Sequence, residues 1–411
     1  MDILPILSTL KRHKIAAGLI VIQIALTCAI VCNALFVITE RLKLIQAPSG
    51  LADRELVVLR IEGLSRSQNP EAQTQADLAA LRALPGVRAA SLVSQLPFGR
   101  NSVAEGVGST PDPRQQNINV GRYVASENWL PTLGLTLAEG RDFEPAEYAD
   151  GAQVFKPGEE PKVPAVIINR ALAERMFPGR SALGQPIYVY GAAPQIVVGV
   201  LEHLPSPNPG LADERERYTM VLPIRPTFRG GIYVLRASPD ADRQAVLKAA
   251  AAALEQSSQG GKRLFRQQRL LEELRADYYR QDRFMVGLLL AVCAAMLVVT
   301  AFGIVGLASF WVQQRSRMIG TRRALGASRA QILRYFQTEN FLLSSIGITL
   351  GMALAYGINL MLMTQYELPR LPLLYLPIGA LLLWALGQLA VLGPARRAAA
   401  LPPMLVMRGL N

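Results

Sequence analysis

Four long stretches of the chain carry no charged residue. They are residues 15–39, 284–314, 340–366 and 371–395, and a charged residue bounds each of them on both sides. A helix of about 20 apolar residues crosses a bilayer, and in lipid the backbone must hydrogen-bond to itself. We therefore predict four transmembrane helices. The first apolar run is too long for a cleavable signal peptide, so we expect it to be an uncleaved signal anchor.

The region between the first two apolar stretches, residues 41–283, has the mixed periodicity of an α/β (α+β) domain. Strand patterns at 55–63 and 87–98 flank a helical pattern at 71–84, and strand 230–238 precedes helix 242–256, with a further strand before residue 270. Two β-α-β units predict a split ferredoxin-like porter part. The insertion between them, about residues 118–217, has its own strand patterns at 163–169 and 186–202 and a helix at 170–177.

The last part of this region, about residues 268–283, spaces its apolar residues at helical intervals. Leu270, Leu271, Leu274 and Tyr278 define the pattern, and no Pro or Gly separates them from the second apolar stretch. Helical spacing without a breaker favours one uninterrupted helix. We predict a continuous helical stalk between this domain and the second transmembrane helix.

The distribution of charge predicts the topology. Net charge is +12, yet residues 41–283 hold 30 Lys/Arg against 27 Asp/Glu, so the excess lies beside the apolar stretches. Twelve Lys/Arg lie in the N-terminus, in residues 315–338 and in the C-terminus, against one in the loop between the third and fourth stretches. Lys and Arg in short loops stay on the cytoplasmic side. This distribution also indicates contact with anionic lipid and excludes nucleic acid as a partner.

The predicted order along the chain follows from these patterns. It is a cytoplasmic N-terminus (1–14), a transmembrane helix (15–39), an extracytoplasmic domain (41–283), a second transmembrane helix (284–314), a cytoplasmic segment (315–338), two further transmembrane helices (340–366 and 371–395) and a cytoplasmic tail (396–411).

The cytoplasmic segment has an internal design beyond its six arginines. Ser328 and Gln331 form a capping-box pattern, so we expect a helix to begin at Ser328. Gly326 is a natural stop for a short preceding helix. Two readings stay open: the arginines only fix the orientation, or the segment is a rigid bent lever that receives a push from a cytosolic partner.

Catalytic motifs are missing from the sequence. It has no Walker A motif, no H-E-x-x-H, no G-x-S-x-G and no paired-cysteine metal spacing, so we predict no catalytic, cofactor-binding or metal-binding residue in the chain. Cys28 and Cys32 are expected to be packing residues. Glycines in the apolar stretches predict close helix packing within the chain or between subunits. These glycines are Gly303, Gly306, Gly347 and Gly351.

The segment between the second and third apolar stretches resembles the signature of MacB/FtsX-type ABC transporter permeases, also called type VII or mechanotransmission ABC proteins. The family segment reads like R-x-x-E-I-G-x-R-R-A-L-G-A-S/T-x-x-x-I-x-x-x-F-x-x-E. The matching residues are Arg315, Ile319, Gly320, Arg322, Arg323, Ala324, Leu325, Gly326, Ala327, Ser328, Ile332, Phe336 and Glu339. Met318 stands where the family usually has Glu, which alters any contact that this acid makes with the ATPase.

Further blocks also resemble the family. Residues 120–143 end in a G-R-D-F pattern, residues 166–189 and 195–203 look like the following core blocks, and residues 394–409 look like the usual terminus. The resemblance implies a MacB-like periplasmic core domain and a bacterial cytoplasmic (inner) membrane location.

The resemblance also implies partners. ATP and Mg would bind to a separate cytosolic ABC ATPase, present in two copies. The coupling residues would be Met318, Glu339 and the matching residues from Arg315 to Ser328. A second permease, identical or homologous, would complete the transporter. A periplasmic adaptor or outer-membrane channel would be a further partner only in a Gram-negative cell. The expected role is efflux or envelope transport; the alternatives are an FtsX-like regulator of an envelope protein, a lipoprotein-extraction permease, and a membrane-anchored sensor.

Overall fold

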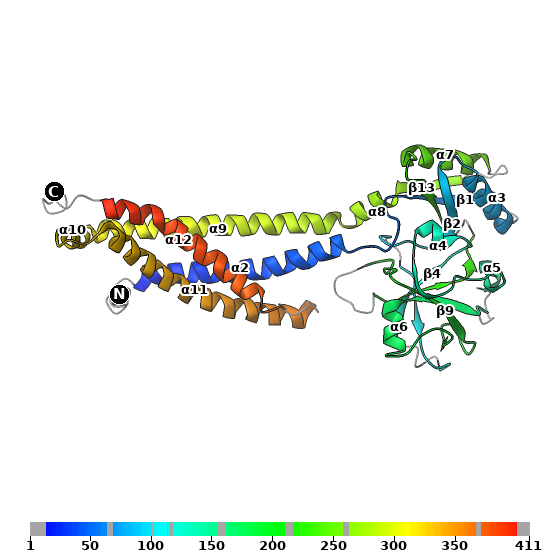
Figure 1. Ribbon diagram of the computed structural model, residues 1–411, viewed down its shortest axis with the longest axis horizontal. Coiled ribbons are helices and arrows are strands. Elements are labelled where there is room, and N and C mark those ends of the chain that lie inside the picture. The colour runs from blue at the N-terminus through cyan, green and yellow to red at the C-terminus, as the bar shows by residue number, and fades with distance from the viewer. Residues whose placement is uncertain are drawn as a thin grey trace. The chain divides into compact units, whose positions relative to one another are not determined.

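The structure is a computed structural model of the chain. It describes residues 14–63, 69–99, 102–112, 114, 118–154, 162–209, 217–227, 229, 231–257, 263–366 and 371–400. The chain divides into two compact units, one made of residues 1–45 and 282–411 and the other of residues 46–281 (Figure 1).

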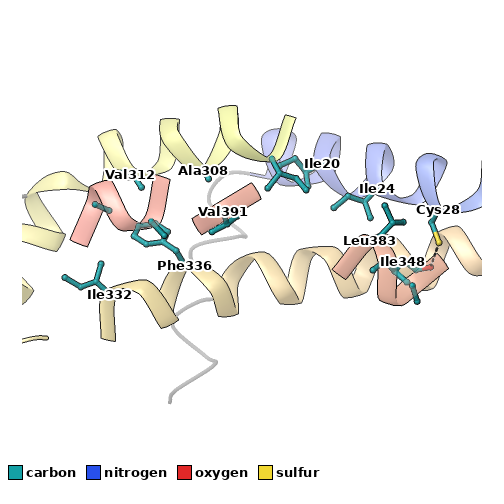
Figure 2. Close-up of a cluster of buried hydrophobic side chains, with 14 of the residues drawn as sticks. Ile20, Ile24, Cys28, Ala308, Val312, Ile332, Phe336, Ile348, Leu383 and Val391 are labelled. Carbon is teal, nitrogen blue, oxygen red and sulfur yellow. Dashed lines mark hydrogen bonds between the residues drawn. The ribbon is translucent and has the colours of Figure 1, made fainter. Parts of the chain in front are cut away.

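The first unit contains four long helices. They are α2 (Lys14–Gln46), α9 (Arg280–Gln314), α11 (Arg329–Tyr366) and α12 (Tyr375–Ala400), and each is long and apolar enough to cross a membrane. This confirms the prediction of four transmembrane helices. Small residues and branched aliphatic residues from all four helices form a shared core, in which Ile24, Ala308, Ile348 and Leu383 are buried (Figure 2).

The first sheet of the second unit has the order β13-β1-β12-β2, with every neighbouring pair antiparallel. Its elements are β1 (Leu56–Gly63), α3 (Pro70–Arg82), β2 (Val87–Val93), β12 (Ile232–Ala237), α7 (Arg243–Gln256) and β13 (Arg263–Leu270). The helices α3 and α7 contribute Leu78, Leu81 and Leu254 to the core under the sheet. Two β-α-β units in this strand order are the split ferredoxin-like arrangement that the sequence predicts.

A second sheet is inserted between β2 and β12. Its path is β3-β4-β10-β7-β9-β5, with β8 paired to β9. The strands are β3 (Ala104–Val107), β4 (Ile118–Val124), β5 (Leu137–Gly140), β7 (Ala165–Asn169), β8 (Pro186–Ile187), β9 (Gln195–Leu201) and β10 (Thr219–Leu222). β6 (Ala149–Asp150) pairs with β11 (Ile224–Arg225). Short helical segments join these strands: α4 (Trp129–Leu133), a 3₁₀ turn (Pro145–Glu147), α5 (Gly151–Val154) and α6 (Arg170–Met176).

The inserted sheet includes strands on both sides of the predicted insertion, residues 118–217, along the chain. β3 and β10 lie outside those limits and belong to the sheet through their pairing with β4. The four residues of β3 show no alternation of polar and apolar side chains, and such short strands acquire their structure from the neighbouring strand.

The predicted continuous stalk is wrong in two respects. Residues up to Leu270 belong to β13, and the helix that follows, α8 (Leu271–Tyr278), is separated from α9 by Tyr279. Tyr279 is almost fully buried, and its ring lies 5.8 Å from Phe98 and 5.0 Å from Tyr278, centroid to centroid. Tertiary burial of an aromatic ring therefore interrupts a helical pattern that contains neither Pro nor Gly.

Candidate functional site

A short helix, α10 (Ser316–Ala324), joins the end of α9 to the start of α11. It ends in a Schellman motif, because the Gly326 N–H donates to the Arg323 carbonyl and the Ala327 N–H donates to the Arg322 carbonyl, at 3.1 and 3.0 Å. Gly326 has φ +94°, a conformation that side chains with a Cβ rarely adopt. The sequence correctly predicted this helix stop.

The start of α11 is fixed by a capping box. The Ser328 N–H donates to Gln331 Oε1 at 2.8 Å, and the Gln331 N–H donates to Ser328 Oγ at 3.3 Å. Two donors that the first helical turn leaves free are satisfied in this way. The turn between α10 and α11 is therefore stabilised on both sides by its own hydrogen bonds.

The inner face of α10 is anchored to α11 and α12. Ile319 is 3% exposed and packs in the bundle core with Ile332 and Phe336, while Gly320 is also buried. Arg323 Nη1 donates to the Ala399 carbonyl at 2.9 Å, near the end of α12. The Arg322 guanidinium lies over the Tyr335 ring, 5.3 Å from its centroid. These contacts hold α10 to the bundle from several directions.

A buried ion pair connects the start of the segment with its end. Arg315 Nη1 donates to both carboxylate oxygens of Glu339, at 2.9 and 2.7 Å, and the two side chains are 8% and 1% exposed. The Arg315 guanidinium also lies 5.4 Å from the Trp311 ring centroid. Such a pair contributes little net stability, but removal of one partner leaves a buried charge uncompensated, which costs about 3–5 kcal/mol.

The outer face of the segment carries apolar side chains that no described residue of this chain covers. Leu325 is 83% exposed and Met318 is 38% exposed, and Ala324, Gly326 and Ser328 are exposed beside them, while Ala327 is half-buried. Exposed apolar residues on a rigid segment are typical of a protein docking surface. The segment therefore presents an anchored inner face and an open outer face.

The four glycines predicted for helix packing have different surroundings. A Cβ at Gly351 would lie 2.5 Å from the Cys28 Cβ, and one at Gly347 would lie 2.9 Å from the Ile24 Cβ, so both glycines allow α11 to approach α2. A Cβ at Gly303 would lie 2.5 Å from the Gln23 Oε1, also on α2. Gly306 has no atom within 4 Å of such a Cβ. Three of the four therefore serve packing within one chain.

The two cysteines of α2 also lie at close packing points. Cys28 faces Gly351, and the Cys32 Sγ lies 2.4 Å from the position of a Cβ at Gly379 of α12. Both thiols are free and fully buried, and Cys28 Sγ donates to the Ile348 carbonyl at 3.8 Å. This burial is what a packing role requires.

The sequence did not reveal several buried polar residues beside the ion pair. Trp311 on α9 and Asn340 and Ser344 on α11 are buried in the bundle, and Gly387 of α12 faces the last two. The only signal in the sequence was the spacing of Asn340 and Ser344 within an apolar stretch, since residues four apart lie on the same side of a helix.

Two family models match the chain. The model described as MacB-like periplasmic core domain matches residues 19–253, and the model described as FtsX-like permease C-terminal matches residues 290–403. Together they cover most of the first transmembrane helix, most of the second unit, and the remaining helices with the segment 315–339.

Curated relatives agree with these matches. The macrolide export ATP-binding/permease protein MacB of Chromobacterium violaceum is 26% identical over 304 residues, covering 71% of this chain and 44% of the relative. The pyoverdine export ATP-binding/permease protein PvdT of Pseudomonas entomophila is 30% identical over 301 residues, covering 71% and 43%. An uncharacterized ABC transporter permease of Bacillus subtilis, YknZ, is 26% identical over 289 residues, covering 69% and 68%. The chain thus spans less than half of the length of the first two relatives.

Solved structures similar to this chain include the periplasmic region of MacB from Actinobacillus actinomycetemcomitans, with 11% identity and a TM-score of 0.34, covering 57% of this chain and 97% of that one. The family model for the periplasmic core covers more than half of the sequence, and the FtsX-like model follows it along the chain. The chain belongs to the family of MacB/FtsX-like ABC transporter permeases.

Proposed function

We propose that the chain is the permease of an ABC transporter of the mechanotransmission kind. Its coupling segment, residues 315–339, receives the ATP-driven motion of a cytosolic ABC ATPase, and the transmembrane helices relay this motion to the extracytoplasmic domain. ATP and Mg bind to the ATPase, and this chain contributes no catalytic residue. The observation that carries the proposal is the segment with an anchored inner face and an open outer face.

The anchoring explains how such a segment transmits force. Ile319 is buried in the bundle core, Arg323 is bonded to the end of α12, and Arg315 is paired with Glu339. A push on the outer face therefore moves α9, α11 and α12 together instead of bending a loose loop. Met318 stands at a position where the family usually has Glu. The docking contact of this chain at that position is therefore apolar and not a salt bridge.

The proposed orientation follows from the arginines. With residues 315–338 and both termini in the cytoplasm, the coupling segment faces the ATPase, and the MacB-like domain lies outside the membrane. Two permease chains, identical or homologous, and two ATPase subunits form the working complex. The cargo is proposed by similarity to be a substrate of efflux or envelope transport, since two of the relatives are named for macrolide export and pyoverdine export.

The experiment is affinity purification of the full chain from its native host, followed by measurement of ATPase activity and by native mass spectrometry of the complex. We expect an ABC ATPase to copurify in a 2:2 assembly. Leu325→Asp should release the ATPase, because it places a charge on the apolar outer face. The matched control is Leu373→Asp, an equally apolar, 68% exposed position just before α12. Loss of the ATPase in both variants, or in neither, would contradict the proposed docking face.

An FtsX-like regulator uses the same coupling but moves no cargo. The two functions are separated by the partner of the extracytoplasmic domain: an envelope enzyme that copurifies with the chain and is activated by ATP would favour regulation. An ATP-dependent loss of a small molecule from the cells would favour transport.

A further inference from the structure

A cluster of polar side chains lies inside the helical bundle beside the coupling segment. Its members, called the polar cluster below, are Trp311, Arg315, Glu339, Asn340 and Ser344, which are 5%, 8%, 1%, 6% and 1% exposed. Trp311 lies on α9, Arg315 directly follows the end of this helix four residues later, and the other three lie in the first half of α11. Two helices therefore bring their polar positions to one place in an otherwise apolar core.

Several atoms of the polar cluster have unused hydrogen-bonding capacity. Within the described part of the chain, no protein atom is a hydrogen-bond partner of Trp311 Nε1, Arg315 Nη2, Asn340 Nδ2 or Ser344 Oγ, and all four are buried. Buried polar groups in native proteins are satisfied with few exceptions, often by ordered water. Unpartnered donors gathered at one place therefore point to a bound ligand.

A small cavity lies beside three members of the polar cluster. Its volume is about 10 Å³, and its walls include Trp311, Glu339 and Asn340 together with apolar residues such as Ala308 and Val391. That volume suits the centre of about one water molecule. Figure 2 shows Ala308, Phe336 and Val391, which come from three different helices and surround this part of the core.

Gly387 of α12 leaves this place open. A Cβ at position 387 would lie 3.1 Å from both Asn340 Nδ2 and Ser344 Oγ, closer than most packed side chains come. The absence of a side chain therefore leaves space beside the two polar groups, and the same measurement shows that these groups lie near each other.

We propose that the polar cluster binds one buried water molecule that bridges α9 and α11. The water accepts hydrogen bonds from Trp311 Nε1 and Asn340 Nδ2 and donates to the Glu339 carboxylate and Ser344 Oγ. Water supplies both functions, whereas an indole N–H only donates and a carboxylate only accepts. An anion is repelled by Glu339, a cation is repelled by Arg315 and the donors, and a larger ligand exceeds the cavity.

The water extends the Arg315–Glu339 ion pair into a wider polar link between the two helices. Arg315 and Glu339 then act as positioning residues that hold the end of α9 to α11, directly beside α10. This role in coupling rests on the proposed function. The water site itself does not, and its test needs no ATPase.

The test is X-ray radiolytic footprinting of the full chain in lipid nanodiscs, in which ionised water oxidises the side chains that it touches. Trp129 is the internal standard, since it is 1% exposed and its Nε1 donates to Asp142 at 3.1 Å. We expect Trp311 to be oxidised severalfold faster than Trp129. Equal rates for these two buried tryptophans would overturn the proposal.

Variants distinguish oxidation of Trp311 by a bound water from oxidation by bulk water that enters when the bundle opens transiently. The double variant Asn340→Leu with Ser344→Val should lower Trp311 oxidation to the rate of Trp129. The control Ser345→Val should leave Trp311 unchanged, because Ser345 bonds to Phe341 and Trp384 outside the polar cluster. Unchanged Trp311 oxidation in the double variant would mean access from bulk solvent and would refute a bound water.

A second measurement tests the proposal on the wild-type chain, in case the double variant fails to fold. A cryo-EM map of the wild-type chain, at a resolution that shows ordered water, should contain a density peak within hydrogen-bond distance of Trp311 Nε1 and Asn340 Nδ2. A map that shows ordered water elsewhere in the protein but none at this place would overturn the proposal.

Discussion

Asp77 offers the sharpest test of how the extracytoplasmic domain is stabilised. It is fully buried and accepts hydrogen bonds from Tyr233 Oη at 2.6 Å, Ser257 Oγ at 2.6 Å and Arg263 Nη1 at 3.0 Å. The partners lie on β12, after α7 and on β13, so one carboxylate joins both halves of the ferredoxin-like sheet. Burial and the neighbouring Asp77 carboxylate raise the pKa of Tyr233, which therefore stays a donor.

Asp77→Ala should lower the free energy of unfolding of this domain by about 3–5 kcal/mol, because it removes one partner of a buried ion pair and the acceptor of three hydrogen bonds. The Arg263 side chain is only 5% exposed and cannot turn to solvent without breaking its bond to the Leu254 carbonyl. A loss of that size is a large share of the roughly 5–15 kcal/mol by which domains are stable. The free energy of unfolding of Asp77→Asn should lie between those of the wild type and Asp77→Ala, since the Asn amide oxygen still accepts hydrogen bonds but carries no charge.

The assay is urea unfolding of the full chain in detergent, followed by pulse proteolysis of the extracytoplasmic domain. The matched control is Glu62→Ala, which removes an acid from the same sheet but from an ion pair with Arg266 in which both side chains are more than half exposed. That change should cost less than about 1 kcal/mol. If Asp77→Ala costs no more than Glu62→Ala, the buried carboxylate does not hold the two halves together.

Three further predictions concern other parts of the chain. Gly351→Ala should lower the thermal unfolding midpoint in detergent, because its Cβ would lie 2.6 Å from the Ala25 carbonyl oxygen. The control Gly306→Ala, at a position with open space around it, should leave the midpoint unchanged. Equal midpoints for the two variants would refute close packing of α11 on α2. Arg323→Glu should abolish ATPase stimulation while membrane insertion stays intact, because it breaks the bond to the Ala399 carbonyl; unchanged stimulation would contradict the anchoring role. Hydrogen bonds from Arg141 lower the pKa of Glu147, so the pair stabilises the domain above the ordinary pKa of about 4.3 and loses this contribution as the pH falls through the folded-state pKa. Glu147→Gln should therefore flatten the acid side of a stability-against-pH curve by at most about 1 kcal/mol, and an unchanged acid limb would show that the pair contributes nothing.

The sequence predicts those features that depend on local pattern. Uncharged stretches define the four helices, because lipid permits no other solution for a single apolar segment. The Ser328–Gln331 capping box and the Gly326 stop are also local, and the structure contains both. The two β-α-β units follow from alternation and helical periodicity, which is why the ferredoxin-like sheet was predictable.

Other features depend on contacts between distant residues, and the sequence does not reveal them. The break at Tyr279 comes from its burial against Phe98, and the membership of β3 in the inserted sheet comes from pairing with β4. Within the site, a resemblance in the sequence predicts that the segment 315–339 docks the ATPase, and this assignment stays a prediction. The pairing of Arg315 with Glu339 and the gathering of Trp311, Asn340 and Ser344 required the packing of α9 on α11.

In the proposed mechanism, motion at the coupling segment reaches the extracytoplasmic domain. Spin labels at Asp240→Cys, an exposed position in that domain, can report the distance between two permease chains in the complex purified with its ATPase, since the native cysteines are buried. We predict that ATP changes this distance in the wild type, and that Gly326→Pro, which cannot adopt φ +94°, abolishes the change in those complexes that still contain the ATPase. An ATP-driven change of the same size in the Gly326→Pro complex would contradict transmission through the coupling segment.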